Sequence, residues 1–374
     1  MSASLRQGYN WLRFVFVFLF RAILSDVDVF HYGDNGLPCY RIPALLATSK
    51  GSLLAFSNAR NWTGDNCYPD YIKRACNETS CNVYVSSRRS PDGGKTWGPI
   101  VYHQLGVLGT VVYDKVHSHI VVQYCVGEGN CKTNRSTHQM ISIDDGLTFS
   151  QPTPVDQYLG KFPGVHPCCG EALQLPSGRL VFCAIHGESP RSHVTVYYSD
   201  NGGQTYQSSP TAGDQMKDMG ECTMALLSNG SIYMNMRPHI NPEMCDCRAY
   251  AVSDDSGESW HGPYYDRDLL NGEGCEASVL GIGSGTVFFS NPYSTSASRA
   301  NMTVLRSDDN AQTWSKIYQV NNGLAGYSSL AQLPWDDYYV GLLYETGAPG
   351  CNESACKIVY TEVPKDLAMF SPID

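Results

Sequence analysis

Cysteine is the residue type in this chain whose number and spacing most directly suggest chemistry. The 374 residues contain 15 cysteines. Three closely spaced pairs would close small loops as disulfides in an oxidising compartment: Cys76/Cys81, Cys125/Cys131 and Cys351/Cys356. The adjacent cysteines at 168–169 and the Cys-Asp-Cys segment at 245–247 leave zinc as an alternative, but they lack the paired Cys-x₂-Cys pattern of structural zinc, so no metal is expected. The odd total leaves at least one thiol unpaired or joined to another chain.

A second pattern, Ser-x-Asp-x-Gly-x-Thr-aromatic, occurs five times. The copies are "SPDGGKTW" at 90–97, "SIDDGLTF" at 142–149, "SDNGGQTY" at 199–206, "SDDSGESW" at 253–260 and "SDDNAQTW" at 307–314. Five acidic segments could bind calcium or carbohydrate. However, Asp or Asn followed by Gly is typical of a tight turn, in which side chains bond the backbone and Gly adopts positive φ. A motif that recurs once per structural unit is more typical of a structural element than of a binding site, so we interpret the copies as turns.

The spacing of these turns predicts the elements around them. Successive copies begin 52 to 57 residues apart. A period near 50 residues is typical of repeat architectures, and four strands per repeat is the pattern of a β-propeller. The intervening segments are rich in β-branched and aromatic residues and lack sustained helical periodicity. Five motif-bearing units, plus a motif-free unit closed by an N-terminal strand, predict an all-β, six-bladed β-propeller over residues 26–374.

The charge balance restricts the class of ligand. Lys and Arg number 26 against 36 Asp and Glu, which gives a formal net charge of −10. A nucleic-acid or anionic-membrane partner calls for a basic face, so neither is expected. Any site for an anionic ligand must therefore be positive locally.

The N-terminus and the sequons indicate the secretory pathway. The apolar run Phe14–Phe20 is too short to span a membrane, and Arg13 precedes it. Residues 1–25 are therefore predicted to be a signal peptide or a short N-terminal anchor. Six Asn-x-Ser/Thr sequons occur, at Asn61, Asn77, Asn134, Asn229, Asn301 and Asn352. We expect an N-glycosylated protein of the secretory pathway.

The repeated turns resemble the Asp boxes of the sialidase (neuraminidase) superfamily. Upstream of the first box, "CYRIPALL" at 39–46 resembles the Phe/Tyr-Arg-Ile-Pro motif that opens sialidases, and "GSLLAFSNAR" at 51–60 resembles the strand that follows it. The similarity runs from about residue 30 to the end, and segments such as "GTVFFSNP" and "LLYETG" look most like the animal lysosomal branch. The resemblance implies an exo-α-sialidase that releases terminal sialic acids from glycoproteins, glycolipids and oligosaccharides without a cofactor. The resemblance also implies a secreted or lysosomal location and, for a lysosomal protein, a protective protein partner.

The chemistry of sialic acid explains which residues such a site needs. The sugar carries a carboxylate on its anomeric carbon, and guanidinium groups match carboxylate oxygens and stay charged. A carboxylate nucleophile would be repelled by that group, whereas a phenol would not, and sialidases use a Tyr nucleophile. A phenol with an ordinary pKa near 10 needs a base to activate it. A separate acid must protonate the leaving oxygen.

The resemblance assigns these roles to residues of this chain. Those expected to bind and react are Arg41, Arg237 and Arg299 for the substrate carboxylate, Glu345 to orient Arg41, Tyr327 as nucleophile, Glu221 as its base and Arg60 in the pocket lining. Arg306 rivals Arg299, but it abuts the fifth Asp box and should lie at the far end. The general acid is expected in the cysteine-bearing loop after Arg60, where Asp65 fits best and Asp70 is the rival.

One departure and two alternatives remain open at this level. Asn58 stands where the family usually has an acidic residue, which removes a charge near the expected sugar and bears on substrate preference. A propeller that binds sialylated glycans without catalysis would keep the arginines but would not need the Tyr–Glu pair. A trans-sialidase would share the site residues and differ in how it excludes water. In each case the site is expected at one end of the propeller axis, opposite the Asp boxes.

Overall fold

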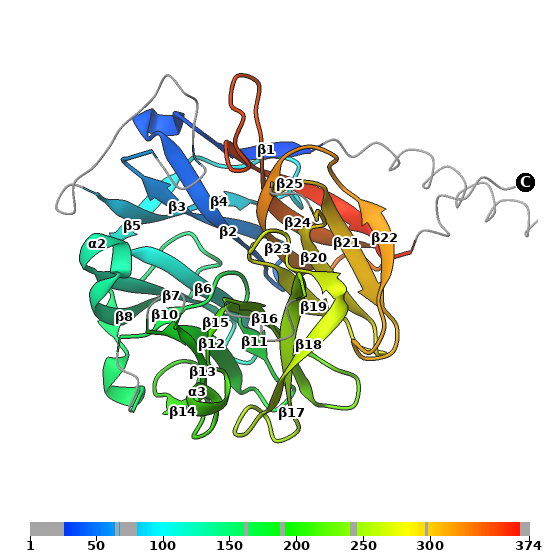
Figure 1. Ribbon diagram of the computed structural model, residues 1–374. Helices are drawn as coiled ribbons and strands as arrows, with labels where there is room; N and C mark the ends of the chain where they lie inside the picture. The colour runs from blue at the N-terminus through cyan, green and yellow to red at the C-terminus, as the bar shows by residue number, and fades with distance from the viewer. Residues whose placement is uncertain are drawn as a thin grey trace, which may run out of the picture.

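The computed structural model describes residues 26–63, 67, 81–160, 164–187, 191–239, 245–295 and 298–366. In these ranges the strands form six antiparallel sheets arranged around a central axis (Figure 1). The prediction of an all-β, six-bladed propeller is confirmed. No helix within the described ranges is long and apolar enough to cross a membrane.

Five sheets follow one another along the chain, and each begins with its innermost strand. The first sheet contains β2 (Cys39–Ala47), β3 (Leu53–Arg60), β4 (Val83–Ser90) and β5 (Val101–Leu105). The second contains β6 (Val107–Asp114), β7 (His119–Gly127), β8 (Thr133–Ser142) and β9 (Thr153–Pro154). The third contains β10 (His166–Pro167), β11 (Leu173–Gln174), β12 (Leu180–His186), β13 (His193–Ser199) and β14 (Gln207–Ser208). Its inner strand is split, since β10 and β11 both pair with β12.

The fourth and fifth sheets repeat the four-strand order. The fourth contains β15 (Met219–Leu226), β16 (Ile232–Pro238), β17 (Cys247–Ser253) and β18 (His261–Leu270). The fifth contains β19 (Ser278–Gly281), β20 (Val287–Pro292), β21 (Met302–Ser307) and β22 (Ser315–Gln319). The short helices lie between strands: α2 (Glu128–Cys131), α3 (Ala212–Gln215), η1 (Asp34–Gly36) and η2 (Asp156–Tyr158).

The sixth sheet joins the two ends of the described chain. It contains β23 (Ala325–Gln332), β24 (Tyr339–Thr346), β25 (Lys357–Pro364) and, at its outer edge, β1 (Val27–His31). Asp28 of β1 pairs with Val359 of β25. The N-terminal strand therefore closes the ring, as the sequence predicts.

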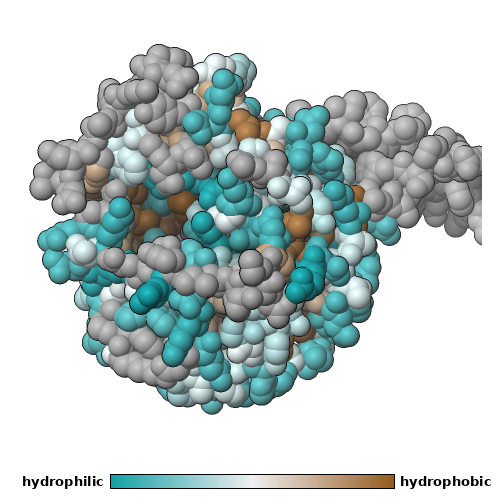
Figure 2. Space-filling view, in the orientation of Figure 1, coloured by the Kyte–Doolittle hydropathy of each residue, from teal (hydrophilic) through white to brown (hydrophobic). Residues whose placement is uncertain are grey.

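The hydrophobic core lies between neighbouring sheets. One cluster packs Val181 and Val196 of the third sheet against Met224 and Met234 of the fourth, and Trp260 of the fourth Asp box completes it at 2% exposure. The inner strands bury both faces in this way, and β2 is buried along its whole length. Figure 2 shows hydrophilic residues over most of the visible surface, with hydrophobic residues mainly in recesses.

The five Asp boxes form the same hydrogen-bonded turn. In the first, Gly94 N donates to Ser90 Oγ at 2.8 Å, and Thr96 N and Oγ1 donate to the two oxygens of Asp92 at 2.9 and 2.6 Å. These bonds stabilise the ionised carboxylate and lower the pKa of Asp92 to about 2. Asn201 in the third copy reverses one bond, because its Nδ2 donates to Thr205 Oγ1 at 2.8 Å.

Each Asp box follows the third strand of its sheet, so the boxes lie at the end of the propeller where the inner strands finish. A cavity of about 620 Å³ opens there, lined by the last residues of several inner strands and by Glu171. Burial raises the pKa of the Glu171 carboxyl to about 7, with Lys115 opposing the shift. The folded protein therefore retains a proton that the unfolded chain, with an ordinary carboxyl, loses near pH 4.5.

Replacing Glu171 by Gln is expected to stabilise the protein at neutral and alkaline pH. The raised folded-state pKa means that the wild type loses stability as pH rises from about 4.5 through about 7, whereas the amide has no proton to lose. The gain should be roughly 1–3 kcal/mol at pH 8 and vanish near pH 4. Urea unfolding of both proteins at the two pH values measures it, and a gain independent of pH would contradict the explanation.

Candidate active site

The predicted site residues come from the ends of strands that face the opposite end of the propeller from the Asp boxes. Arg41, Glu221 and Tyr327 lie at the beginnings of β2, β15 and β23. Arg237 and Glu345 lie near the ends of the second strands β16 and β24. The inner strand of each sheet begins at the end of the propeller where the second strand finishes. These five residues, which are dispersed along the sequence, therefore lie at the same end of the propeller axis.

Each inner strand that carries such a residue is irregular at that point. The pairing register shifts between Arg41 and Ala44 in β2, between Met219 and Cys222 in β15, and between Ala325 and Ser328 in β23. A β-bulge turns a side chain out of its regular alternation and is common beside functional sites. In β2 the bulge places Ile42, a β-branched residue, at φ 62°, a strained conformation that must be held by its surroundings.

The carboxylate of Glu345 holds two of these bulges together. It accepts hydrogen bonds from Arg41 Nε and Nη2, both at 2.9 Å, and from the backbone nitrogens of Ile42 at 2.8 Å and Tyr327 at 3.0 Å. Arg41 and Glu345 have side-chain exposures of 1% and 0%. A Cβ on Gly326 would lie 2.4 Å from Glu345 Oε2, so glycine is required before Tyr327. Glu345 thus fixes Arg41 and the Tyr327 backbone with one group.

Tyr327 and Glu221 form the centre of the cluster. The Tyr327 hydroxyl donates to Glu221 Oε1, and Arg237 Nη1 donates to Glu221 Oε2 at 2.9 Å. Burial by itself would raise the pKa of the Glu221 carboxyl, but the Arg237 guanidinium and the Tyr327 hydrogen bond outweigh it and lower that pKa. Burial and the Glu221 charge raise the pKa of the Tyr327 phenol well above its ordinary value, against the opposing effect of Arg237 and Arg41. The pair therefore rests as a neutral phenol beside a carboxylate.

Three arginines surround this phenol. The Cζ atoms of Arg41 and Arg299 lie 4.9 and 5.5 Å from the centroid of the Tyr327 ring. Arg299 Nη2 donates to Gly274 O at 2.9 Å, and a Cβ on Gly274 would lie 2.9 Å from Arg237 Nη2. Gly274 therefore lies against two of the guanidinium groups. The convergence of the three arginines makes the site locally positive, although the net charge of the protein is negative.

Arg306, the rival of Arg299, lies elsewhere. It is at the other end of β21 from the cluster, and its Nε donates to Asp308 Oδ1 at 2.8 Å beside the fifth Asp box. Arg60 ends β3 with its Cζ 5.0 Å from the Trp62 ring centroid. Both proposed general acids, Asp65 and Asp70, lie outside the described residues.

Asn58, the residue that departs from the family pattern, has a packing role here. Its Oδ1 accepts a hydrogen bond from Leu108 N at 2.7 Å, and its side chain is fully buried. The amide joins β3 to the next inner strand, β6. An acidic side chain would accept the same hydrogen bond but would bury a charge between two sheets.

Two buried ionisable residues beside the cluster were not predicted. Glu276 lies just before β19, much as Glu221 lies at the beginning of β15. The Oε2 atom of Glu276 accepts a hydrogen bond of 3.1 Å from the backbone nitrogen of Ser328, the residue after Tyr327. Burial, reinforced by the Glu221 charge, raises its pKa well above the ordinary value. Arg248 lies fully buried nearby, with Nε donating to Asn235 Oδ1 at 2.7 Å. The position of Glu276, immediately before an inner strand, was the sequence signal that could have identified it as a site residue.

The cysteines form more bonds than their spacing predicts. The expected pairs Cys125–Cys131 and Cys351–Cys356 are confirmed as disulfides, and the Cys245–Cys247 segment is also joined by one. Cys39 bonds to Cys67, which ties that residue to the start of β2. The expected Cys76–Cys81 pair involves Cys76, which lies outside the described residues.

Comparison with known proteins identifies the class. A family model described as a BNR repeat-like domain matches residues 103–340. A sialidase of Bacteroides fragilis is 28% identical over 375 residues, covering 89% of this chain and 64% of that protein. A sialidase of Micromonospora viridifaciens is 29% identical over 365 residues, covering 87% and 52%.

Solved structures agree on the fold. A Hadza microbial sialidase superimposes with a TM-score of 0.74 at 22% identity, covering 91% of this chain and 68% of that one. This chain belongs to the BNR repeat-like family and, with it, to the sialidase superfamily. It spans between half and two thirds of the length of these two curated relatives.

Proposed function

We propose that this protein is an exo-α-sialidase that hydrolyses terminal sialic acids with retention of anomeric configuration. The observation that carries the proposal is the Tyr327–Glu221 hydrogen bond at the centre of three arginines. A glycan-binding propeller needs the arginines, but it has no use for a buried phenol bonded to a carboxylate. The sialidase relatives favour the same class.

In the proposed first step, Arg41, Arg237 and Arg299 bind the substrate carboxylate and hold the anomeric carbon over Tyr327. The phenol oxygen attacks that carbon, and its proton passes to Glu221 as the bond forms. The proton must move with bond formation because the phenol pKa is raised and a free tyrosinate is disfavoured there. Asp65 donates a proton to the departing glycosidic oxygen, and the products are the shortened glycan and a covalent sialyl-tyrosine.

In the second step, water attacks the same carbon from the face that the glycan left. Asp65, now ionised, takes a proton from the water, and the carbon–oxygen bond to Tyr327 breaks while Glu221 returns its proton to the phenolate. Two inversions give net retention. Substrates for this reaction would be glycoproteins, glycolipids including gangliosides, and oligosaccharides.

Hydrolysis of an aryl sialoside by the purified protein tests the proposal. We expect release of the aryl group, and proton NMR at early times should show the α-anomer of free sialic acid. Transfer of sialic acid to an added galactoside in preference to water would instead indicate a trans-sialidase. A folded protein that binds sialyllactose and releases no aryl group at any pH would leave only the binding propeller.

The environment of Glu221 predicts the acid side of the pH profile. Because Arg237 holds the pKa of the base below its ordinary value, Glu221 remains ionised at mildly acidic pH. Replacing Arg237 by Met should move the acid limb of kcat/KM to higher pH, in addition to lowering its maximum. Arg306→Met, at the far end of the blade, is the matched control and should leave the profile unchanged. An unmoved limb in the Arg237 variant would show that another group sets it.

We further propose that the protein is an N-glycosylated enzyme of the secretory pathway, secreted or lysosomal, similar to the animal lysosomal branch. The disulfides and the six sequons support this location. A lysosomal location would also suit a protective protein partner. Expression in animal cells, followed by removal of N-glycans and by microscopy, tests it, and a protein found unglycosylated in the cytosol would reject it.

A further inference from the structure

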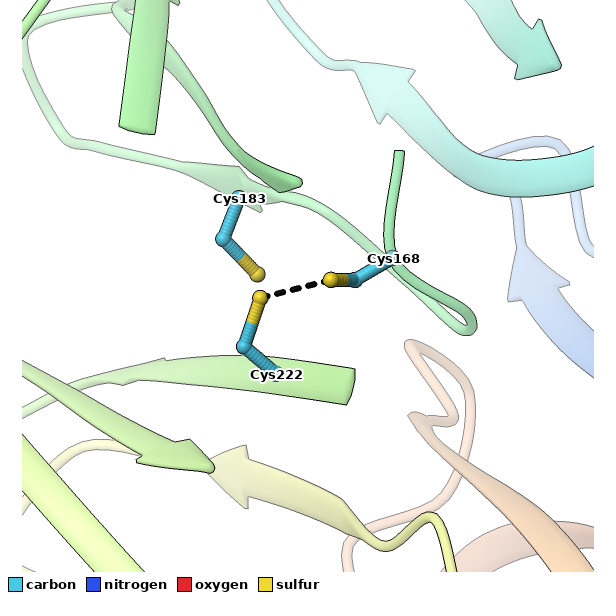
Figure 3. Close-up of side chains that lie close together, drawn as sticks. All are labelled: Cys168, Cys183 and Cys222. Carbon is cyan, nitrogen blue, oxygen red and sulfur yellow. Dashed lines mark hydrogen bonds between the residues drawn. The ribbon is translucent and has the colours of Figure 1, made fainter. Parts of the chain in front are cut away.

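Three buried cysteines meet directly behind the proposed site. Cys168 lies between β10 and β11, Cys183 lies on β12, and Cys222 lies on β15, so they come from two neighbouring sheets (Figure 3). Their Sγ atoms all lie within 4.8 Å of one another, and those of Cys168 and Cys222 are 2.7 Å apart. We call these three residues the thiol cluster. Each is at most 6% exposed.

The 2.7 Å separation is too short for two unbonded sulfur atoms at rest. Even smaller carbon atoms prefer about 3.5–4.0 Å, whereas a disulfide bond is about 2.05 Å long. We propose that the thiol cluster is an oxidation site, in which Cys168 and Cys222 form a disulfide between the third and fourth blades and Cys183 remains a thiol. Cys168 is already tied to Cys183 by a backbone hydrogen bond of 3.0 Å, so only a bond to Cys222 adds a link between blades.

A soft metal ion held by three thiolates is the competing occupant, and the spacing of the sulfur atoms disfavours it. Metal–sulfur bonds of about 2.3 Å would hold the sulfurs roughly 4 Å apart. Without a metal ion, burial raises the pKa of the Cys168 and Cys222 thiols well above the ordinary range. Burial also acts on Cys183, but hydrogen bonds from the other two thiols outweigh it and lower its pKa to about 6. A disulfide between Cys168 and Cys222 would place a neutral group in this apolar core.

The bond would brace the two segments on which the proposed chemistry depends. Cys222 directly follows Glu221, and Cys168 directly precedes Cys169. Cys169 packs in one buried cluster with Ile42, Cys275 and Tyr327. A link from Cys168 to Cys222 thus fixes the backbone behind both the phenol and its base.

The oxidation balances with a small-molecule disulfide such as oxidised glutathione. One cysteine thiolate attacks the reagent, releases one glutathione and forms a mixed disulfide. The second cysteine sulfur then attacks the protein sulfur and releases the second glutathione. Two protein thiols lose two electrons and two protons, and the reagent gains them. Because the cluster is buried, this exchange belongs to folding, before the blades close.

Disulfide mapping of the full-length protein tests the proposal without any variant. Protein purified without reductant is denatured in acid, alkylated and digested. We expect a cross-linked peptide that joins residues 168 and 222, with Cys183 alkylated. Alkylation of all three cysteines after refolding with oxidised glutathione would overturn the proposal, and so would release of one equivalent of metal ion on denaturation.

Two single variants distinguish the effect of the proposed Cys168–Cys222 disulfide from the effect of losing one buried sulfur atom. Cys222→Ala and Cys183→Ala each remove one buried sulfur from the same cluster, but only the first removes the proposed link. Cys222→Ala should lower the melting temperature by roughly 5 °C more than Cys183→Ala does. Cys222→Ala should also lower kcat/KM at least about fivefold more than Cys183→Ala does. The kcat/KM comparison rests on the proposed sialidase activity, whereas the disulfide mapping and the melting temperatures are independent of it. Equal losses in the two variants would reject the link.

Discussion

Replacing Tyr327 by phenylalanine is expected to lower kcat/KM for an aryl sialoside at least about 10³-fold while leaving the protein folded. The change removes a single oxygen atom, the one that would form the covalent bond. Glu221 keeps its 2.9 Å hydrogen bond to Arg237, so no buried carboxylate is left without a partner. The ring keeps its contacts with Arg41 and Arg299. Binding of sialic acid should therefore survive, and release of the aryl group should not.

Tyr197→Phe is the matched control for this change. Tyr197 is also buried and donates its hydroxyl hydrogen to Gln123 Oε1 at 2.6 Å, but it lies in the core between sheets. Its loss should cost about 1 kcal/mol of stability and change kcat/KM less than twofold. Activity that persists in the Tyr327 variant would keep the enzyme and assign the nucleophile to another group. Equal losses in both variants would point to general destabilisation.

The fold could be predicted from sequence because its signal is local. Each Asp box is held by bonds between residues two to four positions apart, such as Ser90, Asp92 and Gly94, so the motif is complete within one turn. Its five regularly spaced copies, with the motif-free remainder as a sixth unit, then predict the number of blades. Even the departures follow local rules, since Ala311 stands at the glycine position of the fifth copy and adopts φ 64°.

The site could be predicted only through resemblance, because its bonds are long-range. Tyr327 and Glu221 are 106 residues apart, and Arg41 and Glu345 are 304 apart. No pattern of charge or hydropathy connects them. The bulges that turn these side chains inward left a weaker signal, the glycines at 220 and 326 that precede Glu221 and Tyr327 within strands.

The cysteines show the same division between local and long-range signals. Spacing predicts Cys125–Cys131 and Cys351–Cys356, because a short segment can close on itself. It does not predict the Cys39–Cys67 bond or the thiol cluster. The cluster depends on how the third and fourth blades pack, and the sequence shows only that the residues are cysteines.

Replacing Glu345 by Gln is expected to destabilise the protein by about 3–5 kcal/mol, because it removes one partner of a buried, hydrogen-bonded ion pair. The amide cannot reproduce the four hydrogen bonds that the carboxylate accepts. Its NH₂ group would face a guanidinium or backbone donor. Because Glu345 holds both Arg41 and the Tyr327 backbone, kcat/KM should also fall at least about 10²-fold.

Urea unfolding of the Glu345→Gln and Asp28→Asn variants compares the stability contributed by this buried ion pair with that of an exposed one. Asp28 Oδ1 accepts a 2.6 Å bond from Lys357 Nζ at the edge of the same sheet, but its side chain is 54% exposed. Solvent screens that pair, so its loss should cost only about 0.2–1 kcal/mol and leave activity unchanged. A Glu345 variant no less stable than the Asp28 variant would mean that the strained backbone at Ile42 is held by its packing, and that Glu345 does not position the nucleophile.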